Sequence, residues 1–344
     1  MKYGLPYMGS KNVIAEWIIR NLPRRKHLYD LFAGGCAITH CALVSGKFKN
    51  IHANDITDVP YLFRDSVYGM YKNETRWISR TDFEHLKETD RYVRVCWSFG
   101  NNQKRYIYSK EVEEYKKALH YAIVFRDYSL IDKYDERLKT IIDADDIHTR
   151  RLNCKKNYGM LLHIIPGACL LKDLPYSYTP KFKPTNSAAP ENEINKFLGL
   201  PINESKESKF KRLQRFEQIE SLERLERLQN LQSIKNIECI NFTQGDYREI
   251  EILPDSVIYC DIPYKSTMDY LHSFDYDAFY EWCRQQTEPI IISEYNMPND
   301  FICIAENHHQ NLYSSDANNT ITERLFIPYH QSNIFNISKQ LSLF

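Results

Sequence analysis

The sequence predicts an α/β protein whose parallel, nucleotide-binding sheet is built from both ends of the chain. Near the start, the apolar run "KHLYDLFAGG" reads as a strand that ends in a glycine turn, and "CAITHCALVSG" reads as the helix that follows. "KNIHAND" is then a second short strand ending in Asp55. A strand, a glycine turn, a helix, a strand and an acid is the pattern of a nucleotide-binding βαβ unit.

The same alternation returns after about residue 237. The runs "IECINF", "DSVIYCD", "EPIIISEY" and "RLFIPY" are short and rich in β-formers, and "DYDAFYEWCRQ" between the second and third is a helix candidate. Because the two ends of the chain share one pattern, we expect them to form one sheet.

Residues 61–236 between these ends are predicted to be an insertion, mostly helical, as in "SKEVEEYKKALHYAIVF". The stretch "LPYSYTPKFKPTNSAAPENE" reads as loop because prolines recur in it. From 213 to 234, apolar residues recur every third position, which would carry the apolar stripe around an ideal helix. We expect one or two helices there and assign the segment no chemistry.

Composition excludes several classes of protein. Lys and Arg number 45, as do Asp and Glu, so a non-specific polyanion binder is disfavoured while local basic patches stay open. The nine cysteines include no C-x-x-C pair and no Cys/His set at zinc spacing, so we expect no metal and reduced thiols in the cytoplasm. No apolar run approaches the roughly 18 residues of a membrane span.

The glycine turn favours a nucleoside over a dinucleotide. "DLFAGG" lacks the third glycine of G-x-G-x-x-G, and no P-loop lysine follows, so a pyrophosphate ligand is disfavoured. Asp55 lies 20 residues after Gly35 at the end of the next strand, where an acid can accept the hydroxyls of a ribose. An ordinary tight turn is the alternative.

The tetrapeptide "DIPY", 261–264, ends another predicted strand, and ligands of open α/β sheets bind beyond such strand ends. The Asp261 carboxylate and the Ile262 carbonyl are two acceptors that match the two hydrogens of an exocyclic amine. Pro263 stiffens the corner, and Tyr264 offers a face for stacking a base, a contact of about 1–3 kcal/mol. The alternative is an Asp that caps a turn.

These motifs together resemble a known family. "YCDIPY" resembles the catalytic tetrapeptide of the DNA amino-methyltransferases, "YDLFAGGCAI" their S-adenosylmethionine motif, "AND" at 53–55 their ribose-binding acid and "LPYMGSK" their N-terminal motif. "ISEYNMP" and "TITERLFIP" resemble late segments. With the tetrapeptide last, after a long insert, the order is that of the Dam-like (D12 class) adenine-N6 enzymes. The similarity covers roughly residues 1–60 and 237–330.

The resemblance implies a Rossmann-like, S-adenosylmethionine-dependent methyltransferase domain from residues 1–60 and 237–344, with 61–236 as an inserted target-recognition region. Two sets of site residues follow from it. Those for the target base are Asp261, Ile262, Pro263 and Tyr264, and those for the cofactor are Tyr7, Gly9, Lys11, Asp30, Phe32, Gly34, Asp55, Asp246, Tyr247 and Asp261. In one departure, Ile262 replaces the first proline of the family's pair, which keeps the carbonyl and removes some rigidity.

The implied function is methyl transfer to adenine N6 in double-stranded DNA, with the base flipped out and the methyl passed directly in line. The chain has no Pro-Cys dipeptide, which cytosine-C5 enzymes need for nucleophilic attack. Cytosine N4, RNA adenine, protein glutamine or a DNA-binding homologue without turnover are the alternatives. We expect a monomer, and the sequence leaves open whether a restriction enzyme is a partner.

The segment "SFGNNQKRY", 98–106, is the predicted DNA reader. Asn102 can pair with adenine, Arg105 with guanine, and Lys104 with phosphate. A polar surface loop is the alternative. The basic clusters at 150–157 and 209–215 can also contact phosphate, although a solvated helix face explains the second one better.

Overall fold

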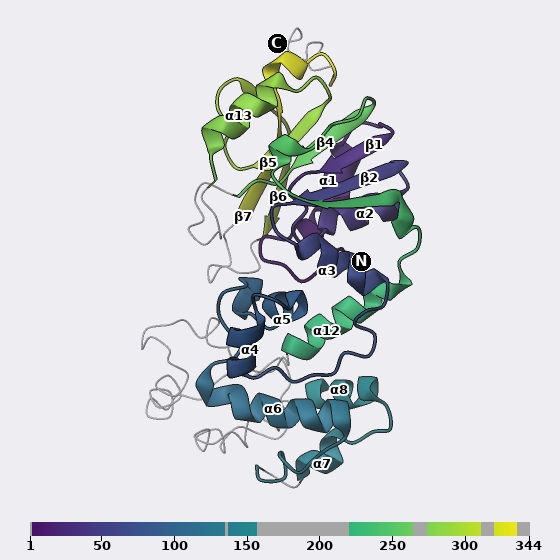
Figure 1. The fold of residues 1–344 in the computed structure, drawn as a ribbon, viewed down its shortest axis with the longest axis vertical. Coiled ribbons are helices and arrows are strands. Elements are labelled where there is room, and N and C mark those ends of the chain that lie inside the picture. Colours follow the sequence, from purple (N-terminus) through teal and green to yellow (C-terminus); the bar gives the residue numbers. More distant parts are fainter. Residues whose placement is uncertain (1, 135–136, 157–219, 264–273, 311–319, 336–344) are drawn as a thin grey trace. The chain divides into compact units, whose positions relative to one another are not determined.

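The computed structural model describes residues 2–134, 137–156, 220–263, 274–310 and 320–335 (Figure 1). The chain forms two compact units. The first consists of Met1–Glu74, Arg80–Tyr106 and Arg224–Phe344, and the second of Thr75–Ser79 and Ile107–Glu223. The predicted loop at 174–193 lies outside the described residues.

The first unit contains a seven-stranded sheet in the order β3-β2-β1-β4-β5-β7-β6. Its strands are β1 (His27–Asp30), β2 (Asn50–Asp55), β3 (Ile240–Gln244), β4 (Ser256–Cys260), β5 (Ile290–Glu294), β6 (Phe301–Gln310) and β7 (Thr320–Pro328). Strands β1 to β5 are parallel, and β7 runs antiparallel to both β5 and β6. The predicted Rossmann-like sheet, built from both ends of the chain, is confirmed.

Helices before and between the strands complete this unit. They are α1 (Ala15–Asn21), α2 (Ala37–Ser45), α3 (Val59–Val67), α4 (Arg80–Leu86), α5 (Arg91–Cys96) and α13 (Tyr276–Gln285), with short 3₁₀ turns at η1 (Lys11–Val13), η2 (Phe99–Asn101), η5 (Ile237–Cys239), η6 (Tyr247–Glu249) and η7 (Tyr329–Gln331). The glycine-turn helix and the helix before β5 therefore form where the sequence predicts them.

The second unit is helical in its described part, with α6 (Lys110–Phe125), α7 (Arg137–Ile142) and α8 (Ile147–Lys156). In the three-residue repeat, residues 220–233 form α12 (Glu220–Asn230) and then η4 (Leu231–Ser233), while 213–219 lie outside the described residues. Leu225, Leu228 and Leu231 are all buried. The 3₁₀ turn helps to keep the stripe inward, because a step of three residues is one full 3₁₀ turn.

The central strands are buried along their whole length. Every residue of β1, β4 and β5 is buried, as expected for parallel strands covered on both faces. The connections reverse direction between β1 and β4, and ligands of such sheets bind beyond the strand ends at that point. Asp30 ends β1 opposite Tyr259 of β4, so the structure brings Asp30 and Asp261 to the same edge.

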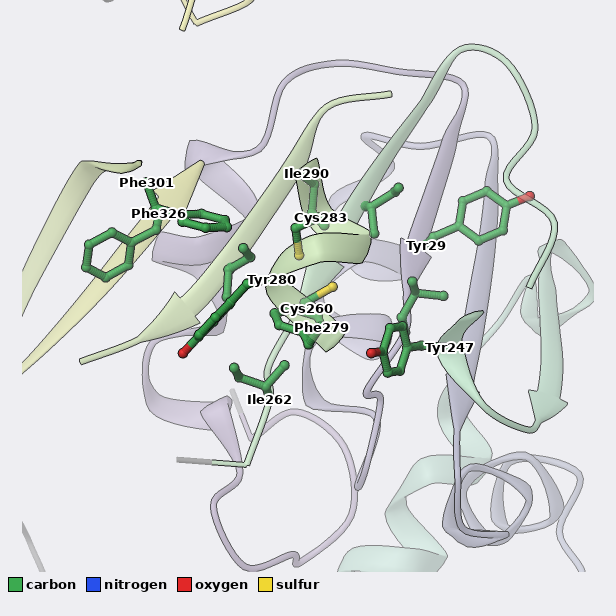
Figure 2. Close-up of a cluster of buried hydrophobic side chains, with 13 residues drawn as sticks. Tyr29, Tyr247, Cys260, Ile262, Phe279, Tyr280, Cys283, Ile290, Phe301 and Phe326 are labelled. Atoms are coloured by element: carbon green, nitrogen blue, oxygen red, sulfur yellow. The ribbon is translucent and has the colours of Figure 1, made fainter. Parts of the chain in front are cut away.

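A core cluster lies under this edge and includes Tyr29, Tyr247, Ile262, Phe279 and Tyr280 (Figure 2). It joins residues of β1, η6, the chain after β4, and α13. In the described part of the chain, no helix combines the length and apolar character needed to span a membrane.

Candidate active site

The glycine turn after β1 is packed against the N-terminal segment. Gly34 has φ +47°, and a Cβ there would lie 2.8 Å from Cε1 of Tyr7. A Cβ on Gly35 would lie 2.6 Å from the Cβ of Tyr7, and the Leu5 amide donates to the Gly35 carbonyl at 2.7 Å. The glycine pair is therefore needed for close approach of the chain, which brings the predicted residues Tyr7 and Gly34 together.

Asp55, predicted to bind ribose, fixes the same turn. Its Oδ2 accepts the Gly34 amide at 2.8 Å, and its Oδ1 accepts the amide and the hydroxyl of Thr57 at 2.9 and 2.7 Å. A carboxylate oxygen has two acceptor positions, so Oδ2 can take one further donor. The sequence did not predict that Asp55 stabilises the glycine turn, nor that Thr57 donates to it.

Asp30 is a buried carboxylate that is only half satisfied. Oδ2 accepts the amide and the hydroxyl of Thr39 at 3.1 and 2.6 Å, whereas Oδ1 has no hydrogen-bond partner among the described residues. Burial raises the pKa of Asp30 to about 7, and the charges of Asp261 and Asp55 add to the rise. Such an oxygen is suited to a cationic ligand group.

Asp261 lies beside a buried lysine. The Lys11 Nζ is 3.2 Å from Oδ1 of Asp261 and 3.6 Å from Oε1 of Glu323 on β7. Burial raises the pKa of Asp261 to about 6, although Lys11 opposes the rise. Burial alone would lower the pKa of Lys11, but the two carboxylates raise it. Two residues predicted from separate motifs thus form one ion pair.

Glu294 and Glu323 join this site without having been predicted. Glu294 ends β5, its Oε1 accepts the Tyr295 amide at 2.7 Å, and burial raises its pKa to about 7. Its Oε2 is buried, with no hydrogen-bond partner in the described part of the chain. These acids lie in the segments "ISEYNMP" and "TITERLFIP", which resemble late segments of the family. That resemblance did not identify either acid as a site residue.

The corner after β4 is held without the family's first proline. The Ile262 side chain is only 2% exposed and packs in the core cluster near Tyr280 (Figure 2). The Tyr276 hydroxyl donates to the Pro263 carbonyl at 2.8 Å. Hydrophobic burial and this hydrogen bond thus restrain the corner. Tyr264, the predicted stacking residue, lies outside the described residues.

The two predicted aromatic residues meet each other. The rings of Phe32 and Tyr247 have centroids 5.3 Å apart, and Trp282 lies 5.0 Å from Tyr247, edge to face. Asp246 is turned to its neighbour, since its carboxylate accepts both the backbone amide and the guanidinium of Arg248. Gly9 lies in an exposed turn with φ +76°.

Comparison with known proteins bears directly on these motifs. Residues 7–144 match the family model described as D12 class N6 adenine-specific DNA methyltransferase. This part of the chain is similar to that class. No curated protein matches the chain. The class implies S-adenosylmethionine-dependent methylation of adenine N6 in DNA, which confirms the resemblance. Base flipping and in-line transfer stay predictions.

The D12-class match includes the N-terminal segment, the glycine turn, Asp55 and the predicted DNA-reading loop, while Asp261 lies beyond it. The described residues hold no group of three or more His, Cys, Asp and Glu side chains arranged to bind a metal ion. The predicted site residues that the structure describes include carboxylates, one lysine and aromatic rings.

The predicted reading loop, 98–106, is a folded turn in the same unit as the sheet. Ser98 and Tyr106 form a β-bridge, and the Phe99 amide donates to the Arg105 carbonyl at 2.7 Å. The Arg224 guanidinium of α12 donates to the Ser98 carbonyl at 2.7 Å. A loop anchored in this way presents its side chains in a fixed arrangement.

Its three predicted DNA contacts differ in their surroundings. Lys104 and Arg105 are exposed. The Asn102 Oδ1, however, accepts the amides of Lys104 and Arg105 at 3.0 and 3.1 Å, and so closes the turn. Bidentate pairing of Asn102 with adenine would compete with these bonds, because that pairing uses the same oxygen as acceptor.

Proposed function

We propose that Asp261 and the carbonyl of Ile262 bind the amino group of a flipped adenine, and that this corner directs methyl transfer to N6. The observation that carries the proposal is the position of Asp261. It follows a buried central strand at the switch point of the sheet, is a fifth exposed, and is held by Lys11 at 3.2 Å.

The chemistry needs two acceptors because the exocyclic nitrogen of adenine is a poor nucleophile. Its lone pair is delocalised into the ring. Hydrogen bonds from the amino group to Asp261 and to the Ile262 carbonyl favour a pyramidal nitrogen with a localised lone pair. Fixed acceptors of this kind act by orientation and electrostatic preorganisation. S-adenosylmethionine, when bound, would supply an electrophilic methyl group for this nitrogen.

The residues present fit that cofactor. The buried Oδ1 of Asp30, which no described residue hydrogen-bonds, is suited to the methionine ammonium group, and the remaining acceptor position on Asp55 is suited to a ribose hydroxyl. Phe32 and Tyr247 offer aromatic surface for the adenine ring. We also propose Tyr7, Gly9, Lys11 and Gly34 as cofactor-binding residues, since Tyr7 packs on Gly34 and Lys11 pairs with Asp261. Asp246 would contribute only after breaking its ion pair with Arg248.

For the remaining partner, we propose double-stranded DNA bound by a monomer in the cytoplasm, with residues 61–236 reading the sequence. Lys104 and Arg105 are exposed on an anchored loop, which supports direct contact with a duplex. Asn102 then supports the turn. To read adenine as well, it would have to give up its hydrogen bonds with the amides of Lys104 and Arg105. A cognate restriction enzyme would be a second partner under this proposal.

Label transfer tests the function. The chain is incubated with S-adenosylmethionine carrying a tritiated methyl group and with duplex DNA, single-stranded RNA or a protein acceptor. We expect label in DNA only, recovered as N6-methyladenine, and Asp261→Ala should abolish it. Sequencing of genomic DNA from a methylation-free host that expresses the chain gives the site. Label as N4-methylcytosine, or in RNA or protein, would refute the proposal.

Three single variants test the loop. Arg105→Ala should weaken binding to the methylated site by about 1–3 kcal/mol, as expected for a residue that reads a base. It should also relax the sequence specificity at the base that Arg105 reads. Lys104→Ala should weaken all sequences alike and reduce the slope of log K against log salt by about one. Lys49→Ala is the control, since Lys49 is exposed just before β2, at the opposite edge of the sheet. If neither loop variant differs from this control, the loop is a bystander.

A further inference from the structure

We propose that Glu323 is a positioning residue, which shares the Lys11 ammonium with Asp261 and so keeps the Asp261 carboxylate available to the substrate amine. The inference rests on the proposed function of Asp261 and adds a residue that no motif assigned.

The geometry is that of a buried triad. Lys11, 6% exposed, lies between Asp261 and Glu323, with Nζ to oxygen distances of 3.2 and 3.6 Å. The three residues come from distant segments: η1, the chain after β4, and the middle of β7. An ammonium group has three donors in a compact charge, so it can serve two carboxylates at once.

Sharing the lysine matters for the chemistry. In a one-to-one buried pair, the ammonium would be directed wholly at Asp261 and would occupy the lone pairs that the amine must reach. Glu323 takes part of that interaction. The Nζ of Lys11 lies within ion-pair distance of both carboxylates, so Asp261 keeps acceptor capacity for the amine.

The charged groups around Asp261 shift its pKa in opposite directions. Lys11 lowers the pKa of Asp261, whereas Glu323 raises it. The other titratable groups that interact with Asp261 are Asp30 at the end of β1, Tyr259 and Cys260 on β4, and Glu294 with Tyr295 at the end of β5. Removing the charge of Glu323 therefore removes one anion and strengthens the attraction of Lys11 to Asp261, and both changes lower the pKa of Asp261.

The test is the pH profile of kcat/KM for Glu323→Gln, measured by label transfer into DNA. Its acidic limb reports the apparent pKa of the coupled site, in which Asp261 must be ionised. We expect the limb to move to lower pH and kcat to fall about tenfold on the plateau, because Lys11 then interacts more strongly with Asp261. The KM for DNA should stay within about twofold. A merely structural residue would reduce activity without moving the limb.

Two further variants complete the experiment. Glu306→Gln is the matched control, since it removes an equal charge from an exposed pair with Arg324, 2.7 Å apart, in the same β6-β7 hairpin. It should leave the profile unchanged. Glu323→Asp keeps the charge but places it farther from Lys11. The acidic limb of this variant should therefore lie between those of the wild type and Glu323→Gln.

The outcomes separate the two proposals. A folded Glu323→Gln whose limb stays in place, or moves to higher pH, overturns the role of Glu323. If that variant does not fold, a wild-type limb in Glu323→Asp overturns it instead. Loss of the proposed function looks different: the wild type transfers no label to adenine, or Asp261→Ala transfers it normally.

Discussion

Replacing Asp30 by Asn should stabilise the protein without ligand while weakening cofactor binding. The side chain is 1% exposed, and burial raises its pKa from 3.8 to about 7. Between these pH values the folded state binds a proton that the unfolded state does not, so stability falls as the pH rises through this window and is constant above it. At about 1.36 kcal/mol per pKa unit, the loss reaches roughly 4 kcal/mol at pH 8.

Asn has nearly the same shape, and its oxygen can still accept the two hydrogen bonds from Thr39. The variant should therefore match the wild type near pH 4 and exceed it by up to about 4 kcal/mol at pH 8. Urea denaturation at both pH values measures this difference. Asp277→Asn, at an exposed position on α13, changes the net charge equally and should not alter the pH dependence.

Cofactor binding should change in the opposite direction. Losing a charge-assisted hydrogen bond to the methionine ammonium should reduce the affinity for S-adenosylmethionine by about 10- to 100-fold, as measured by calorimetry. An Asp30→Asn protein that is less stable than the wild type at pH 8 would refute the burial argument. Undiminished affinity for the cofactor would refute the binding role alone.

Three more variants probe the same edge of the sheet. Asp261→Ala should abolish methyl transfer while circular dichroism stays native, because Lys11 keeps Glu323 as a partner; wild-type turnover would end the proposed role. Asp55→Ala should weaken S-adenosylmethionine binding and also lower the melting temperature, since the Gly34 amide loses its acceptor; an unchanged calorimetric affinity would count against the ribose assignment. Ile262→Ala should lower the free energy of unfolding by about 2–5 kcal/mol in denaturant titration, and a change near zero would contradict the anchoring of the corner by the core.

Local pattern was sufficient to predict the sheet and the residues at its edge. Strand, turn and helix signals act over a few residues, so β1, α2 and β2 could be read directly, and so could β4, α13 and β5. The acids that end those strands followed from the same pattern, since parallel strands direct their carboxyl ends to one edge. Asp55 and Asp261 were identified in this way, whereas Asp30 was assigned from the resemblance to the family.

What only the tertiary structure decided is how those side chains are satisfied. That Asp55 holds the Gly34 amide, that Asp30 keeps one oxygen unpaired and that Lys11 bridges Asp261 to Glu323 depend on contacts between residues far apart in the chain. Sequence spacing carries no information about such distances. Burial then moves the pKa values of these carboxyls, because the energy of a charge depends on the whole surrounding medium rather than on its neighbours in the sequence.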